Sequence, residues 1–189
     1  MKPYSLVLFG GGALLLAACI PSVYPFYSEK DLAFDNRLLG EWHEKAKTND
    51  AQVWTFEKAD DKGYKLKVTE AQGKSGELSA HLFKLKEDYF LDLLPTECNY
   101  ASNQADLVSA CMFPGHLLAR VSQIEPELKI ALFDFDWLEK FLEQEPGALA
   151  HYKGNGPLLL TASTAELQQF VLKHPEVFGK PSEMTRKPN

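Results

Sequence analysis

The segment Tyr64–Glu70, YKLKVTE, alternates apolar and polar side chains more clearly than any other stretch of this sequence of 189 residues. Tyr64, Leu66 and Val68 fall on one face of an extended chain, and the two lysines between them fall on the other, because successive side chains of a strand point to opposite sides. One buried face and one wet face are typical of antiparallel sheets. The segment therefore predicts a half-buried antiparallel strand whose lysines lie in water.

Similar segments lie on both sides of this strand, and short turns separate most of them. They cover residues 38–45, 52–58, 77–85, 89–94, 117–124 and 128–133, and PLLLTAS, residues 157–163, adds a last strand. Turn-forming sequences such as ADDKG, AQGKSG and KED connect neighbouring segments. Hairpin-length connections favour an up-and-down meander of about 7–8 strands, either an open curved sheet or a small closed barrel.

Two helices are expected late in the chain. The first, near residues 136–145, carries an apolar stripe and has Asp134 or Asp136 as its cap. The second, near residues 164–174, begins with a capping box at Ser163. The fold class is therefore mainly β (α+β), with these two helices after most of the strands.

The domain organisation follows from these elements. Residues 1–18 have the layout of a removed export signal, and residues 19–37 form a segment rich in aromatic residues and proline. That segment is too apolar for a solvated linker, so we expect it to lie across the folded domain. Residues 38–178 form one β-rich domain, and residues 179–189 are interpreted as a flexible tail.

Cys19 ends the apolar run of the export signal. The run, residues 6–18, is shorter than the roughly 20 residues that a membrane-spanning helix needs. An ordinary export signal would have a small residue where Leu16 stands. The sequence Leu16-Ala-Ala-Cys19 instead resembles the bacterial lipobox, in which the signal is cut just before a diacylglyceryl-cysteine, and palmitate-type acyl chains then hold the protein on a membrane. A plain signal with an incidental cysteine is the alternative.

The residue after the anchor bears on the location. In lipoproteins of cells with two membranes, an aspartate at this position favours retention in the inner membrane. Ile20 stands there in this chain. The resemblance therefore implies a cell-envelope protein on the periplasmic face of the outer membrane.

A second resemblance starts from Gly40-Glu41-Trp42. A G-x-W on the first strand of a β-meander that has a helix late in the chain resembles the lipocalin family, whose Trp plugs one end of a barrel while the other end binds small hydrophobic molecules. Carried over, Gly40 and Trp42 would be plug residues. The run from YPFYSEKDLAFD to ELSAHLFKL also resembles small bacterial lipoproteins of unassigned function, which implies no activity.

Catalytic and cofactor motifs do not occur in the sequence. It contains no G-x-S-x-G, H-E-x-x-H, Walker A or dinucleotide motif, so neither an enzyme nor a bound cofactor is expected. The formal net charge of −6 argues against nucleic-acid binding. The histidines are scattered singly, which argues against a metal site, and lie at His43, His81, His116, His151 and His174.

Two cysteines besides the anchor bracket a long connection between strands. Cys98 and Cys111 would form a disulfide in an oxidising compartment. A metal site that adds His116, or two free thiols, are the alternatives.

Two functions remain open for the barrel. Trp42, Trp54, Phe56, Tyr64 and Leu66 either line a cavity for a small apolar ligand or fill a solid core. In the second case the protein would be a structural or interaction subunit of an envelope complex, and its partner would be another envelope protein.

Overall fold

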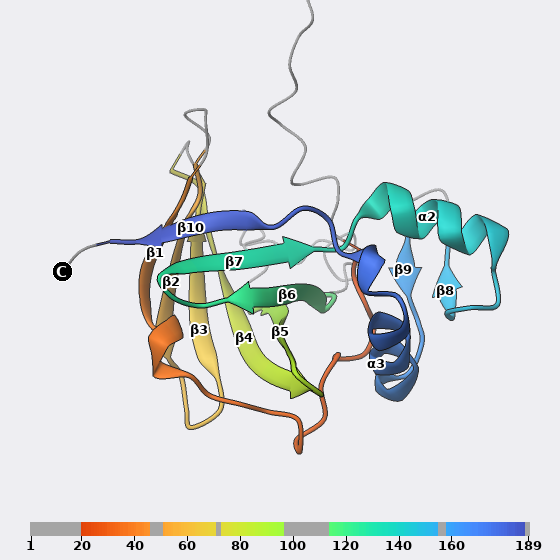
Figure 1. Cartoon of the computed structure of the whole chain (residues 1–189), viewed down its shortest axis with the longest axis horizontal. Coiled ribbons are helices and arrows are strands. Elements are labelled where there is room, and N and C mark those ends of the chain that lie inside the picture. The colour runs from red at the N-terminus through yellow and green to blue at the C-terminus, as the bar shows by residue number, and fades with distance from the viewer. Residues whose placement is uncertain (1–19, 46–50, 71–72, 97–113, 155–157, 188–189) are drawn as a thin grey trace, which may run out of the picture.

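Eight antiparallel strands close into a barrel in the computed structural model (Figure 1). The structure describes residues 20–45, 51–70, 73–96, 114–154 and 158–187. The barrel order is β1, β2, β3, β4, β5, β6, β7 and β10, with β10 returning to β1. The strands are β1 (Gly40–Glu44), β2 (Val53–Lys58), β3 (Tyr64–Thr69), β4 (Ser75–Leu85), β5 (Asp88–Pro95), β6 (Leu117–Gln123), β7 (Glu127–Leu132) and β10 (Ser182–Arg186). The expected mainly β fold is confirmed, in its closed form.

The C-terminal segment corrects one expectation. Residues 179–189 were predicted to form a flexible tail, but β10 lies between β7 and β1 and closes the barrel. Its sequence, SEMTR, buries only Met184, so it lacks the apolar alternation that predicts a strand. Backbone pairing with β7 on one side and β1 on the other stabilises this strand instead, because a barrel without β10 would leave two sheet edges unpaired.

The expected last strand, residues 157–163, is also different in the structure. Among the described residues 158–163 the only strand is β9 (Leu159–Leu160), and it pairs with β8 (His151–Tyr152) in a separate two-stranded sheet outside the barrel. The apolar run that predicted a strand is buried for another reason, because Leu158 and Leu160 pack under the helices.

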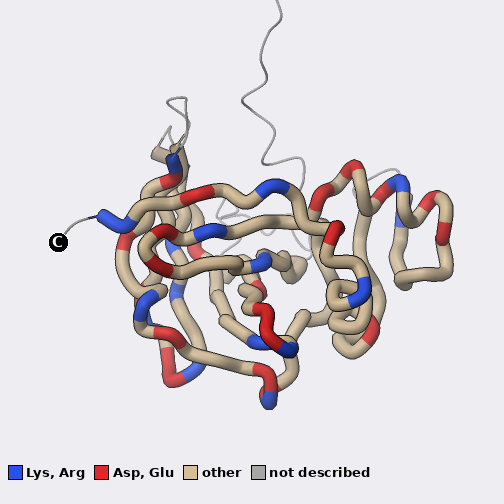
Figure 2. Tube along the Cα trace, viewed as in Figure 1, with Lys and Arg blue, Asp and Glu red and all other residues tan. Residues whose placement is uncertain are grey.

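The inward and outward faces of β3 follow the predicted alternation. Tyr64 and Leu66 are fully buried, while Lys65 and Lys67 are exposed. In the neighbouring ladder Trp42 pairs with Trp54, so both tryptophans face the interior. Figure 2 shows basic and acidic residues interspersed along the barrel strands.

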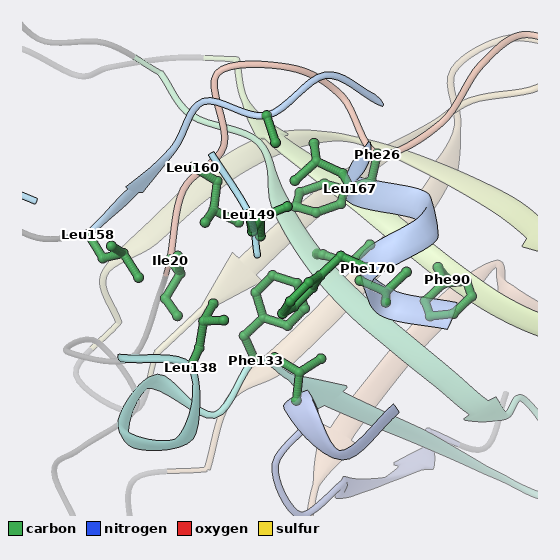
Figure 3. Packing of buried hydrophobic residues seen from close by; sticks show 14 of the residues in the cluster. Ile20, Phe26, Phe90, Phe133, Leu138, Leu149, Leu158, Leu160, Leu167 and Phe170 are labelled. Carbon is green, nitrogen blue, oxygen red and sulfur yellow. The ribbon is translucent and has the colours of Figure 1, made fainter. Parts of the chain in front are cut away.

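A second core lies outside the barrel, between its wall and the helices. Phe83, Phe90 and Leu118 point outward and meet Leu138 and Phe170 there. Figure 3 shows this packing at close range. Because β5 and the second half of β4 are covered on both faces, neighbouring residues there, such as Leu82 and Phe83 or Phe90 and Leu91, are both apolar and buried.

The helices begin where the sequence predicts. Helix α2 (Phe135–Gln144) is capped by Asp134, whose carboxylate accepts a hydrogen bond from Trp137 N–H at 3.0 Å. Helix α3 (Thr164–Lys173) has the complete capping box of Ser163 and Glu166. Short 3-10 turns, η1 (Asn36–Leu38) and η2 (Pro175–Val177), complete the described elements. Neither described α-helix is long and apolar enough to cross a bilayer.

The N-terminal residues 20–34, here called the strap, lie against the barrel wall as expected. Leu32 bridges to Phe83 on β4, and Ser22 bridges to His116 just before β6. Ile20 and Phe26 are buried in the outer core. The strap is therefore part of the folded domain rather than a solvated linker.

Candidate functional site

One end of the barrel is covered by the chain between Phe34 and Leu39, here called the plug. Phe34 stacks on Tyr64 with ring centroids 4.6 Å apart. Leu38, in η1, is fully buried among the interior side chains. The indole N–H of Trp42 donates to the Leu38 carbonyl at 2.9 Å. The plug is thus bound both by stacking and by a buried hydrogen bond.

Arg186 fastens the plug from the last strand. Its guanidinium lies 4.2 Å from the centroid of the Trp42 ring, within cation–π range. Its two terminal nitrogens donate to the carbonyls of Arg37 and Leu39. Gly40 leaves room for this contact, because a β-carbon there would come within 2.9 Å of Arg186 Nη1, and its φ of +112° also favours glycine. The end of β10 is therefore joined to the start of β1 through the plug.

The Tyr64 hydroxyl completes the closed end. It accepts a hydrogen bond from Asp35 N–H at 2.6 Å and donates to the Asp35 carbonyl at 3.1 Å. Burial raises the pKa of Tyr64 to about 12. The phenol therefore stays protonated, and able to donate, well into the alkaline range.

The opposite end of the barrel has a different lining. Five apolar side chains that pack against the inner cluster at this end are only partly buried, although Leu93, the cross-strand neighbour of Leu117, is buried. Each comes from a different strand. We call this set the mouth ring, and it consists of Trp54, Val68, Leu78, Leu117 and Leu132. Fully buried side chains near the plug thus give way to partly exposed apolar side chains at the other end.

The five predicted core or cavity residues all belong to the inner cluster. Trp42, Phe56, Tyr64 and Leu66 are fully buried in it, and Phe56 meets the Tyr64 ring edge-on at a centroid separation of 6.1 Å. Trp54 is the exception, since it stands at the mouth ring with its indole N–H donated to Gln52 at 3.1 Å. Four of the five therefore pack the plug half.

The predicted anchor and disulfide are not described by the structure. Cys19, Cys98 and Cys111 lie outside the described residues. The anchor and the disulfide both stay predictions.

The histidines lie apart, each with its own neighbour. His43 pairs with Glu41 at 2.6 Å, and His81 stacks on Tyr27 with ring centroids 4.8 Å apart. Within the described ranges, His, Cys, Asp and Glu side chains form no group of three that could hold a metal ion.

Asp92 and His116 form a buried polar site that sequence reasoning missed. His116 Nδ1 lies 2.7 Å from Asp92 Oδ1, and Asp92 is only 1% exposed. The other carboxylate oxygen accepts a hydrogen bond from Phe26 N–H of the strap at 2.8 Å. Burial, followed by the charge of Asp92, raises the pKa of Tyr27. Asp92 therefore fixes the strap to the barrel wall.

The comparisons with known proteins add no relative. Neither a family model, nor a curated protein, nor a solved structure matches this chain.

Proposed function

We propose that this protein is a lipid-anchored protein of the bacterial cell envelope whose barrel binds one small apolar molecule at the mouth ring. The observation that carries the proposal is the contrast between the two barrel ends. The inner cluster near the plug consists largely of fully buried side chains, and the five mouth-ring side chains at the other end are apolar and partly exposed. Small eight-stranded barrels have room for side chains or for one small ligand.

The resemblance to lipocalins supports the same proposal. A closed barrel is consistent with a lipocalin-like domain. Gly40 and Trp42 lie at the covered end, where the resemblance expects plug residues. The ligand end would then be the one that carries the mouth ring.

Ligand binding is tested with the mature protein carrying Cys19→Ser, titrated with the fluorescent apolar probe N-phenyl-1-naphthylamine. We expect saturable binding of one probe per chain, with energy transfer from tryptophan. Val68→Gln should weaken binding about tenfold, because it places an amide in the apolar rim. Lys67→Gln is the matched control on the outer face of the same strand and should leave the affinity unchanged.

Absence of saturable binding would defeat the ligand proposal. A solid interior would then favour the structural or interaction subunit, whose partner is another envelope protein.

The anchor is tested separately in cells. Replacing Cys19 by Ser should move the protein from the membrane fraction to the soluble fraction and abolish labelling by a radioactive fatty acid, because the lipid is attached only through this thiol. Substitution of Cys98 by Ser should leave the membrane location and the fatty-acid labelling unchanged. Continued membrane retention of the Cys19→Ser protein would exclude the lipoprotein assignment.

A further inference from the structure

The strap has a direction along the barrel. Ser22 and His116 exchange backbone hydrogen bonds of 2.8 and 2.9 Å, and His116 directly precedes Leu117 of the mouth ring. Further along, Ala33 N–H donates to the Leu82 carbonyl and the chain enters the plug. The strap thus starts at the mouth end and finishes at the plug end.

Little chain separates the predicted anchor from this mouth end. Cys19 is three residues before Ser22, and an extended chain spans at most about 3.6 Å per residue, so the two α-carbons lie within about 11 Å of each other. Ile20, the first described residue, is only 2% exposed, and Figure 3 shows it between Leu138 and Leu158. The domain therefore has no slack linker after the first described residue.

Exposed aromatic side chains lie beside the same residues. Tyr24 is 50% exposed, and its N–H donates to Ser22 Oγ. Tyr152 is 64% exposed and pairs with Leu159 in the small sheet, whose Leu160 exchanges backbone hydrogen bonds with the strap. Tyrosine favours the membrane interface, where its ring meets apolar groups and its hydroxyl meets water.

We propose that the mouth of the barrel faces the bilayer that holds the anchor, and that its ligand is an acyl chain taken from that bilayer. The inference rests on the proposed lipid anchor and ligand site. Tyr24 and Tyr152 touch the lipid surface beside Cys19, and the mouth ring opens toward the hydrocarbon rather than toward the aqueous phase. An acyl chain matches the five apolar side chains of the mouth ring.

The orientation is tested with the lipidated full-length protein in vesicles of phosphatidylethanolamine and phosphatidylglycerol. A photo-crosslinking amino acid, p-benzoyl-phenylalanine, replaces either Ser75 or Asp61. Both positions are exposed, and they flank opposite ends of β3. We expect position 75 to cross-link at least about fivefold more phospholipid than position 61, because the six residues of β3 hold them about 20 Å apart. Equal or reversed labelling would overturn the orientation.

A spacer variant gives the matched control. A flexible Gly/Ser spacer placed between Cys19 and Ile20 should remove the difference between positions 75 and 61, since it frees the domain from the membrane surface. The same spacer added after Asn189 should preserve the difference. If both variants behave alike, the short connection is not what orients the barrel.

The ligand class is tested inside the mouth by placing the same photo-crosslinking residue at Trp54. An adduct whose mass includes an acyl chain supports the proposal, and that mass distinguishes a free fatty acid from a phospholipid. Absence of an acyl adduct overturns it. If the probe titration in solution fails, the proposed ligand site is wrong. If the titration succeeds while positions 75 and 61 label equally, the ligand site stands and the proposed orientation toward the bilayer is wrong.

Discussion

Trp42→Ala is expected to lower the free energy of unfolding by about 3–5 kcal/mol, the range for truncating a large buried aromatic side chain. The indole is fully buried, carries the Arg186 guanidinium on its face and donates to the plug carbonyl of Leu38. Its loss leaves a cavity and removes an attachment of the plug at the same time. Urea denaturation monitored by circular dichroism measures the change.

Two further variants test the reason for this loss. Trp42→Phe keeps much of the apolar volume but removes the hydrogen bond, so about 1–2 kcal/mol should be lost. Lys65→Ala is the surface control and should stay within about 0.5 kcal/mol, because Lys65 is exposed and its ion pair with Glu77 at 3.0 Å is partly exposed. Equal costs for Trp42→Ala and Lys65→Ala would contradict the packing described for the closed end.

Most barrel strands could be predicted because one face is buried and the other faces solvent, which gives an alternation of apolar and polar residues. The pattern at Tyr64 to Thr69 is strict for that reason, and the helix starting at Thr164 is equally predictable because its capping box is local. Such signals need no knowledge of the rest of the fold. They fix where strands and helices begin, but leave open whether a meander closes.

Closure of the barrel could not be predicted, because the residues that stabilise it are not marked by the sequence around them. The sequence around Arg186 is polar, and its role appears only when register places it over Trp42 and beside the plug. Asp92 was missed for a similar reason, since it pairs with a histidine 24 residues away and with the backbone of the strap. A single carboxylate in an apolar strand, YFLDLL, was the one available signal. Buried polar groups require partners, so such a residue predicts that another segment covers the strand.

Removal of the buried Asp92 carboxylate is also expected to lower the free energy of unfolding strongly. Asp92→Ala should lower the free energy of unfolding by about 2–5 kcal/mol, because it removes the partner of two buried or part-buried groups and each such group left unsatisfied costs about 1–3 kcal/mol. The substitution leaves the Phe26 N–H without its acceptor and leaves His116 without its carboxylate partner. Thermal and urea denaturation measure the loss.

The same change should release the strap before the barrel unfolds. Asp92 is one of the contacts that hold the middle of the strap, together with the hydrogen bonds from Thr164 to the Pro25 carbonyl and from Gln168 to the Phe26 carbonyl. Chymotrypsin should therefore cut Asp92→Ala faster within the strap, under conditions in which the barrel still gives its native circular dichroism. Asp88→Ala is the matched control on the same strand, because its partly exposed pair with Arg120 contributes at most about 1 kcal/mol. If Asp88→Ala exposes the strap as much as Asp92→Ala does, the buried carboxylate is not what fixes the strap to the barrel wall.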